Sequence, residues 1–342
     1  MRVSTSAETD TEKVGTMRDG KLEQKHLLFG EDGSPNNYDL NTGLTGGGGW
    51  RTPRHRHTFD QIRYVVKGRL PYSETDFLEE GWLGYFPESV HYGPQERAEG
   101  LQTVVLQCGG ASGLGYLSVA QREAVNAELA KTGEFKKGLY TYTDENGTVQ
   151  TLDGSQAIFE RAMGRKLEFT TPRYTDVIAM NPEAYEWLPQ GDEGVQEKWL
   201  GSFTERNLRL GFLRLDAGAV YQAGQFPSIE ILFQISGQVS TGDKKYGPET
   251  GYEFLANEGP IPVECRAASC GTCWVGVLGG AGKLSPVNER DEGRRMKVFG
   301  YSDTDGAQPL IRLSCQARAR GAVSIVIPPW NGVFGKFIPR RP

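Results

Sequence analysis

The alternation of apolar and polar residues predicts short β-strands along most of the 342-residue chain. Two such segments in the first third are QIRYVVKG, residues 61–68, and LQTVVLQC, residues 101–108. Strand-like runs resume with YTDVIAM, LRLGFLRL and IEILFQIS, and glycine, proline and acidic residues separate them as turns do. We therefore expect a mainly β protein.

One segment, SVAQREAVNAELAKTG, has apolar residues at helical spacing between Val119 and Leu129. Ser118 can accept a hydrogen bond from a backbone N–H of the first turn, so it is the expected N-cap. Gly133 is the expected stop of this helix. A helix is thus expected after the first group of strands.

Composition and charge narrow the function classes. The net charge is −5 with no block of like charge, which argues against nucleic acid and against an anionic membrane surface as partners. No run of about 18 apolar residues occurs, so no membrane-spanning helix is expected. Residues 1–21 are polar without an apolar core, which predicts a disordered tail and no signal peptide. A reducing, cytoplasmic setting is the default expectation.

An internal repeat relates two parts of the chain at an offset of 169 residues. The first copy consists of Gly49, His55, His57, Gln61 and Gly68, and the second of Gly218, Gly224, Phe226, Glu230 and Gly237. Gly81-x5-Pro87 is matched by Gly251-x5-Asn257, one residue beyond that offset. The scaffold is therefore expected to be duplicated, with histidines retained only in the first copy.

The histidine pair is the first candidate for chemistry. His55 and His57 lie two residues apart, and residues i and i+2 of a strand face the same side, so both imidazoles can enter one interior. Gln61, Arg63 and Arg51 share that parity. An alternative is that the histidines line a barrel that binds an organic ligand without metal.

The spacing G-x5-H-x-H-x3-Q-x6-G resembles the first motif of the cupin family, which has Glu where this chain has Gln61. The resemblance implies a double-stranded β-helix barrel over residues 22–125. It also implies Fe(II) or a related divalent metal held by His55, His57 and a third ligand. In the second copy Gly224, Phe226 and Pro262 replace the ligands, so that copy is expected to be structural.

The third ligand has two candidates. The second cupin motif would place a histidine at Tyr92, whereas His91 comes one residue early, and a slip of one residue reverses the face of a strand. A bulge at residues 87–89 would turn His91 inward. Without a bulge, Tyr92 would take its place.

A cysteine cluster is the second candidate for chemistry. Cys265-x4-Cys270-x2-Cys273, followed by Cys315, resembles the plant-type [2Fe–2S] ferredoxins, from about Gly259 to Pro328. The resemblance implies a β-grasp domain whose four cysteines hold the cluster. A structural zinc site is the alternative. Cys108 lies outside the pattern and is expected in the core.

The expected organisation therefore runs from cupin to ferredoxin. After the tail come the cupin (22–125), a helix linker with a degenerate second cupin (126–226), and the ferredoxin-like domain (227–342). One conflict stays open. The strands that a β-grasp unit needs before its first cysteine also carry the second cupin pattern, so the second cupin could extend to about residue 262.

The two sites together favour a non-heme iron oxygenase with its own ferredoxin domain, acting on a small molecule and O2. Gln61 would orient a ligand or bound oxygen, and Arg63 or Arg51 would pair with a substrate carboxylate or phenolate. An NAD(P)H-dependent ferredoxin reductase would supply electrons, because no dinucleotide or flavin fingerprint occurs in the chain. Electron delivery across a homodimer is a further hypothesis.

The first alternative is a ligand-binding or sensor barrel joined to a ferredoxin that carries electrons for another enzyme. The second alternative is an isomerase or lyase with a non-redox metal.

Overall fold

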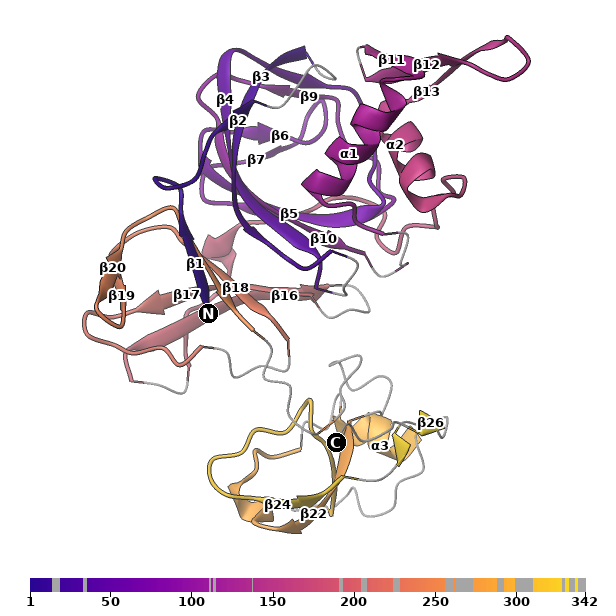
Figure 1. Cartoon of the computed structure of the whole chain (residues 1–342). Helices are drawn as coiled ribbons and strands as arrows, with labels where there is room; N and C mark the ends of the chain where they lie inside the picture. Colours follow the sequence, from indigo (N-terminus) through magenta and orange to yellow (C-terminus); the bar gives the residue numbers. More distant parts are fainter. Residues whose placement is uncertain are drawn as a thin grey trace. The chain divides into compact units, whose positions relative to one another are not determined.

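The computed structural model describes most of the chain, namely residues 1–13, 19–32, 36–110, 112, 115–136, 138–190, 193–203, 208–223, 228–255, 261, 273–287, 292–298, 310–327, 330–331 and 336–337. The chain divides into two units (Figure 1). The first unit comprises Met1–Leu200, Phe212–Ala219 and Ile231–Phe254, and the second comprises Gly201–Gly211, Val220–Glu230 and Leu255–Pro342. The expectation of a mainly β protein is confirmed.

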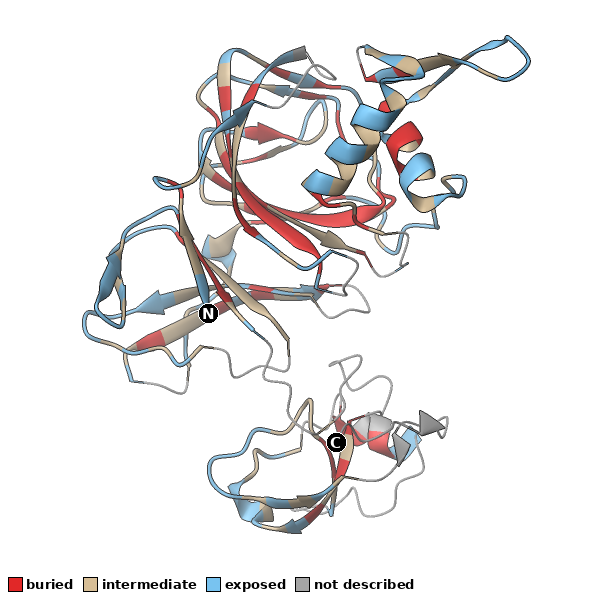
Figure 2. Ribbon diagram, in the orientation of Figure 1, coloured by how far each residue is buried: buried red, intermediate tan, exposed pale blue. Residues whose placement is uncertain are grey.

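The largest element of the first unit is an eight-stranded antiparallel sheet in the order β14-β8-β5-β10-β4-β3-β2, with β9 added to β4. Its strands are β2 (Glu12–Lys13), β3 (Asp19–Phe29), β4 (Tyr38–Thr52), β5 (Phe59–Lys67), β8 (Leu83–Phe86), β9 (Gln95–Arg97), β10 (Gln102–Gly109) and β14 (Ile178–Met180). Every residue of β8 and most residues of β5 are buried, and Figure 2 marks the buried part of this sheet in red. Apolar side chains from its strands and loops form one cluster: Val65, Leu70, Leu78, Phe86, Tyr92, Leu101 and Val177.

The long strand β4 contains four consecutive glycines, residues 46–49. Its register against β3 shifts there, since Leu22 lies opposite Thr45 but Gly20 opposite Trp50. Gly49 has a φ of +75°, and a Cβ on it would lie 2.6 Å from the carbonyl oxygen of Arg97. Glycine is therefore required where β9 approaches β4.

The other strands before residue 255 form smaller sheets. The remaining strands before residue 255 are β1 (Arg2–Thr5), β6 (Leu70–Pro71), β7 (Phe77–Leu78), β11 (Gly133–Lys136), β12 (Leu139–Thr143), β13 (Val149–Asp153), β15 (Leu188–Pro189), β16 (Val195–Phe203), β17 (Leu208–Leu215), β18 (Glu230–Gln234), β19 (Val239–Thr241), β20 (Lys244–Tyr246) and β21 (Thr250–Phe254). They form the sheets β1-β21-β18, β11-β12-β13, β15-β16-β17, β19-β20 and β6-β7. A 3₁₀ turn, η1, spans Pro182–Ala184.

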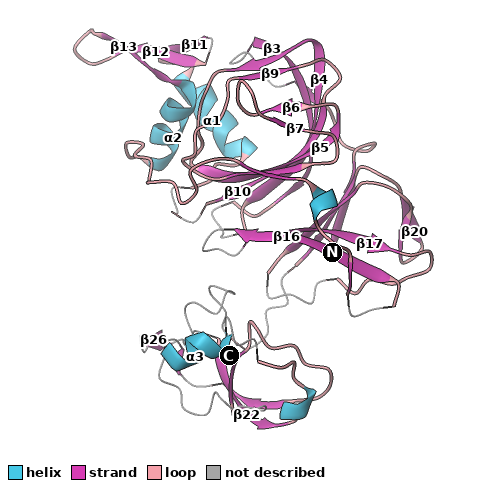
Figure 3. Ribbon diagram, turned by 180° about the vertical axis from the view of Figure 1, so that it is seen from behind, coloured by secondary structure: helices cyan, strands magenta, loops and turns pink. Residues whose placement is uncertain are grey.

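Helices α1 (Val119–Leu129) and α2 (Gly154–Met163) lie side by side next to the main sheet (Figures 1 and 3). The predicted N-cap of α1 is confirmed, because the Ser118 hydroxyl accepts from Gln121 N–H and the Gln121 side chain accepts from Ser118 N–H. The predicted stop was wrong. The helix ends at Leu129, and Gly133 begins β11, which pairs with β12.

The predicted disordered tail is also wrong, because residues 2–5 form β1, which pairs with β21, and β2 and β3 begin before residue 21. Arg2 explains part of this order. Its guanidinium forms an ion pair with the buried carboxylate of Glu253, with Nε 3.0 Å from Oε1, and the Tyr38 hydroxyl donates to the same carboxylate. Backbone pairing with β21 and the ion pair of Arg2 thus hold this strand.

We expect Arg2→Gln to lower the free energy of unfolding by about 1–3 kcal/mol, because it leaves the buried Glu253 carboxylate with fewer donors. The pKa of Glu253 lies below its ordinary value of 4.5 because the hydrogen bonds from Arg2 and Tyr38 outweigh burial, which raises it. The contribution of the Arg2–Glu253 ion pair to stability is therefore present above about pH 4.5. It is lost as the pH falls through the lower pKa that Glu253 has in the folded protein. Urea unfolding at pH 7 and at acid pH measures this contribution.

Arg69→Gln, which breaks an exposed ion pair with Glu79, is the matched control. An equal effect of Arg2→Gln and Arg69→Gln on the free energy of unfolding would contradict the prediction.

The second copy of the repeat has strands at the expected offset. β17, β18 and β21 correspond to β4, β5 and β8, and β18 neighbours β21 as β5 neighbours β8. Gly49 and Gly218 both have positive φ, as do Gly68 and Gly237. Gly224, Phe226 and Pro262 lie outside the described residues.

Residues Ile231–Phe254 group with the first unit. The predicted domain start at residue 227 and the alternative of a second copy that extends to about residue 262 both stay predictions.

The second unit contains a small antiparallel sheet with β22 (Trp274–Gly279) between β23 (Ile311–Leu313) and β24 (Ser324–Val326). Its other elements are η2 (Ala281–Lys283), α3 (Arg294–Val298), β25 (Trp330–Asn331) and β26 (Lys336–Phe337). Across the described part of the chain, no helix has both the length and the apolar character needed to cross a membrane.

Candidate functional site

The two motif histidines lie in the segment between β4 and β5, just before β5 begins. Their rings are 5.0 Å apart between centroids and nearly perpendicular, and both residues are half-buried. His55 and Tyr92 form an isolated antiparallel β-bridge. His55 N–H donates to Tyr92 O at 3.0 Å, and Tyr92 N–H donates to His55 O at 2.9 Å. This bridge, and not a regular strand, brings the second motif to the histidine pair.

Tyr92 completes the cluster. It is buried, its ring centroid lies 4.4 Å from that of His55, and its hydroxyl lies 2.7 Å from Nε2 of His57. We call His55, His57 and Tyr92 the His–Tyr cluster. At this separation the Nε2 atom of His57 and the hydroxyl oxygen of Tyr92 share one proton in a hydrogen bond.

His91, one of the two predicted candidates for the third ligand, does not join the His–Tyr cluster, whereas Tyr92, the other candidate, does. Its side chain is exposed, and its pKa is lowered by partial burial and by the neighbouring charges of Arg56 and Arg54. The chain turns tightly before it, with Ser89 at a φ of +65° and its N–H donating to His57 O. The bridge at residue 92 then sets the inward face, so the adjacent residue points away. The described residues contain no group of three His, Cys, Asp or Glu side chains suited to a metal ion.

Gln61 and Arg63 lie beside the cluster on β5, as the parity argument expects. Both are buried, and Gln61 Oε1 accepts from Arg63 Nε at 3.0 Å and from Nη2 at 2.6 Å. Arg63 Nη2 also donates to the Tyr92 hydroxyl at 2.8 Å. A guanidinium that donates to the phenol oxygen favours negative charge on that oxygen.

Arg51 lies outside the site, contrary to its shared parity. Its side chain is 71% exposed and lies 3.7 Å from Glu96. The segment that contains Pro53 interrupts the strand between residues 52 and 59, so alternation does not carry through it.

The sequence reasoning missed Gln95 and Arg97, which alternate on β9 directly after the second motif. In the sequence, only the i, i+2 spacing of Gln95 and Arg97 indicated that both side chains face the same side of a strand.

The His–Tyr cluster fits a mononuclear metal ion. His55 Nδ1 lies 2.7 Å from Pro53 O, which can only accept, so Nδ1 carries the proton and the ring lone pair is on Nε2. This is the orientation that metal-bound imidazoles usually have. Two imidazoles and a phenol oxygen, with the Gln61 amide close by, form a donor set for a divalent transition metal.

The second candidate site involves the C-terminal cysteines, of which Cys265 and Cys270 lie outside the described residues. Cys273 is buried in a small apolar cluster with Met296 and Leu313, and the half-buried Cys315 packs against it. Ser314 N–H donates to Cys273 O at 3.0 Å, which joins the two cysteine segments. The Gln316 side-chain amide lies 3.5 Å from Cys315 Sγ. A donor at this sulfur stabilises a thiolate.

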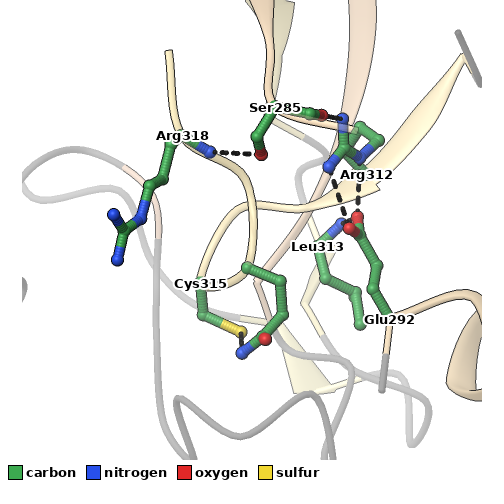
Figure 4. A network of polar contacts seen from close by, with 7 residues as sticks. Ser285, Glu292, Arg312, Leu313, Cys315 and Arg318 are labelled. Carbon is green, nitrogen blue, oxygen red and sulfur yellow. Dashed lines mark hydrogen bonds and ion pairs between the residues drawn. The ribbon is translucent and has the colours of Figure 1, made fainter. Parts of the chain in front are cut away.

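A buried ion pair supports the Cys315 segment (Figure 4). Arg312 donates to Glu292 through Nε at 2.7 Å and through Nη2 at 2.9 Å, and both side chains are almost fully buried. Glu292 Oε1 also accepts from Leu313 N–H at 2.8 Å, two residues before Cys315. Arg312 Nη1 donates to Ser285 O at 2.9 Å. The pair thus fixes the strand that carries the last cysteine.

The predicted cysteine spacing and this geometry agree with a known family. Residues 247–320 match the family of 2Fe-2S iron-sulfur cluster binding domains. The match includes all four cysteines of the predicted cluster, and we call this region the 2Fe–2S domain. The comparison with curated proteins found no match.

Solved structures similar to the chain include a candidate dioxygenase from Nostoc punctiforme, at 13% identity and a TM-score of 0.46, covering 75% of each chain. A single-residue variant of oxalate decarboxylase from Bacillus subtilis is 14% identical with a TM-score of 0.41, covering 75% of this chain and 72% of that one. KdgF from a Halomonas species is 19% identical with a TM-score of 0.26, covering 32% and 93%. At these values the similarity does not identify an activity.

We expect Glu292→Gln to destabilise the 2Fe–2S domain by about 3–5 kcal/mol, because it leaves the buried Arg312 without a counter-charge. The cluster absorbance should then bleach at a lower temperature than in the wild type. Arg318→Ala is the matched control, since Arg318 contacts Ser285 only through its backbone, whose N–H donates to Ser285 Oγ and whose carbonyl accepts from Ser285 N–H. Equal bleaching temperatures for the two variants would show that the ion pair does not support the site.

Proposed function

We propose that the chain is a non-heme iron oxygenase of a small molecule that receives electrons from its own 2Fe–2S domain. The observation that carries this proposal is the presence, in one chain, of the His–Tyr cluster and a 2Fe–2S domain. A cluster of this type transfers single electrons. Placing both sites on one chain gives the electron donor a high effective concentration.

His55, His57 and Tyr92 would hold the metal, for which we propose Fe(II). When bound, iron would supply reductive activation of O2. Arg63 has two roles, because it holds Gln61 through Oε1 and stabilises negative charge on the Tyr92 oxygen. Gln61 would orient a ligand through its amide, as a neutral group in place of a carboxylate. The proton shared by His57 and Tyr92 would leave when a cation binds between them.

The electrons would come from NAD(P)H through a separate ferredoxin reductase. We propose a reducing, cytoplasmic setting for this chain, because a 2Fe–2S domain holds its cluster through cysteine thiolates, which a reducing compartment preserves. Delivery of the electron within one chain and delivery across a homodimer are both compatible with the proposal. They differ in their dependence on protein concentration, since only the second requires association.

Metal analysis together with oxygen uptake tests the proposal. We expect three irons per chain in the anaerobically purified protein. Two belong to the 2Fe–2S cluster, and one is bound at the His–Tyr cluster. We also expect oxygen uptake that depends on an organic substrate and on the reductase. Two irons with no other bound metal would reject the oxygenase.

A second candidate function is a ligand-binding barrel joined to an electron carrier. The observation in its favour is that His57 and Tyr92 already satisfy each other through a hydrogen bond, with no third imidazole among the described residues nearby. This function predicts two irons per chain, a reducible cluster, and no substrate-dependent oxygen uptake.

A further inference from the structure

Two arginines from different strands converge on one neutral acceptor beside the His–Tyr cluster. Arg63 Nη1 of β5 lies 3.3 Å from Gln95 Oε1, and Arg97 Nη2 of β9 lies 3.2 Å from the same atom. Gln95 is 1% exposed and Arg63 is 5% exposed. Two guanidinium groups therefore share a single amide oxygen in a buried position.

Neither guanidinium has an acidic partner among the described residues. Arg63 donates only to Gln61, Gln95 and the Tyr92 hydroxyl, none of which is a carboxylate. The Nε atom of Arg97 is buried and has no hydrogen-bond partner within the described part of the chain. Burial and the charge of Arg63 lower the pKa of Arg97 to about 9. Buried cations in a purely structural role are normally paired with carboxylates, so the two charges indicate a place for an anion.

We propose that Arg63 and Arg97 together bind the carboxylate of an organic acid, which is the substrate of the first unit. This inference rests on the proposed function in one respect, namely that a small molecule enters beside the His–Tyr cluster. The remaining donors favour a carboxylate over phosphate. Most N–H groups of Arg63 are already used, which leaves few donors, and a carboxylate has only two oxygens to satisfy.

The surroundings of the arginine pair suit an acid with an apolar body. The Arg63 guanidinium lies 4.5 Å from the ring centroid of Phe86 and 5.0 Å from that of Tyr92. The rings of His57 and Phe59 lie 4.6 Å apart between centroids and extend the apolar wall. The acid group would contact the arginines, and its body would then lie toward the histidines.

Calorimetric titration of the full-length protein with benzoate tests the inference, with benzamide as the neutral isostere. We expect wild type to bind benzoate and not benzamide, and Arg97→Gln to weaken benzoate binding roughly tenfold to a hundredfold. Gln61→Glu should weaken it similarly, because it places an internal carboxylate on Arg63. Arg51→Gln, on the exposed side of β4, should leave binding unchanged.

Several outcomes would overturn the inference. They are benzamide binding as tight as benzoate binding, unchanged benzoate affinity in Arg97→Gln, tighter binding of phosphate than of every carboxylate, and no binding of benzoate, acetate or oxalate by wild type. If Arg97→Gln does not fold, Gln61→Glu decides the question, because it keeps the side-chain shape. Binding is measured without turnover, so failure of the oxygenase proposal leaves this result intact, and the reverse also holds.

Discussion

Replacing His55 and His57 together with alanine is expected to remove one iron per chain and to abolish substrate-dependent oxygen uptake. The two imidazoles are two of the three donors of the His–Tyr cluster, and a phenol and an amide alone do not retain a divalent transition metal. The absorption spectrum of the 2Fe–2S cluster should not change, because the 2Fe–2S domain binds its irons through cysteines. Iron analysis, visible absorption and oxygen uptake on the same sample measure all three effects.

The exposed His91 supplies the matched control for the double variant. His91→Ala should keep both the third iron and the activity, since its side chain lies outside the His–Tyr cluster. Tyr92→Phe should lose much of the third iron, because it removes only the phenol oxygen. If His91→Ala removed the iron while Tyr92→Phe did not, the ligand set proposed from the structure would be wrong.

Replacing Cys315 with serine is expected to bleach the red-brown colour of the protein and to abolish turnover driven by NAD(P)H through a reductase. The absorption arises from thiolate-to-iron charge transfer, and loss of one of four thiolates destabilises the cluster. The iron at the His–Tyr cluster should remain, so a chemical reductant or peroxide should still support some product. Visible spectra and single-turnover kinetics with pre-reduced protein give the two readouts.

Cys108→Ser is the control for Cys315→Ser, since Cys108 is half-buried on β10 and outside the predicted cluster. It should change neither the spectrum nor the turnover. If pre-reduced Cys315→Ser oxidised substrate at the wild-type rate, the 2Fe–2S domain would not feed the oxygen chemistry. The function as a ligand-binding barrel with an electron carrier would then be preferred.

Features that depend on local spacing could be predicted from the sequence. The strands β5 and β10, the N-cap at Ser118 and the pairing of Gln61 with Arg63 on one face all follow from residues a few positions apart. The spacing of the four cysteines predicted the 2Fe–2S domain for the same reason, since three of them lie within one loop-sized segment. Such patterns report on backbone geometry that the neighbouring residues set by themselves.

Features that depend on distant backbone contacts could not be predicted from the sequence. The bridge to His55, together with the turn at Ser89, sets which of His91 and Tyr92 lies against the histidine pair. The order of residues 2–5 comes from pairing with β21, whose residues lie far along the chain, at Thr250–Phe254. The sequence of β1, RVST, has no alternation of apolar and polar residues that would predict this pairing.

The sequence by itself therefore determined which chemical groups the chain has and which of them share a strand face. Only the tertiary structure decided which strands meet. It placed Arg97 beside Arg63 through β9, which contacts β4 at Gly49, and so brought two positive charges to the buried Gln95. The physical reason is that side-chain alternation acts along one strand, whereas the partners across a sheet depend on loop geometry and on packing of the whole unit.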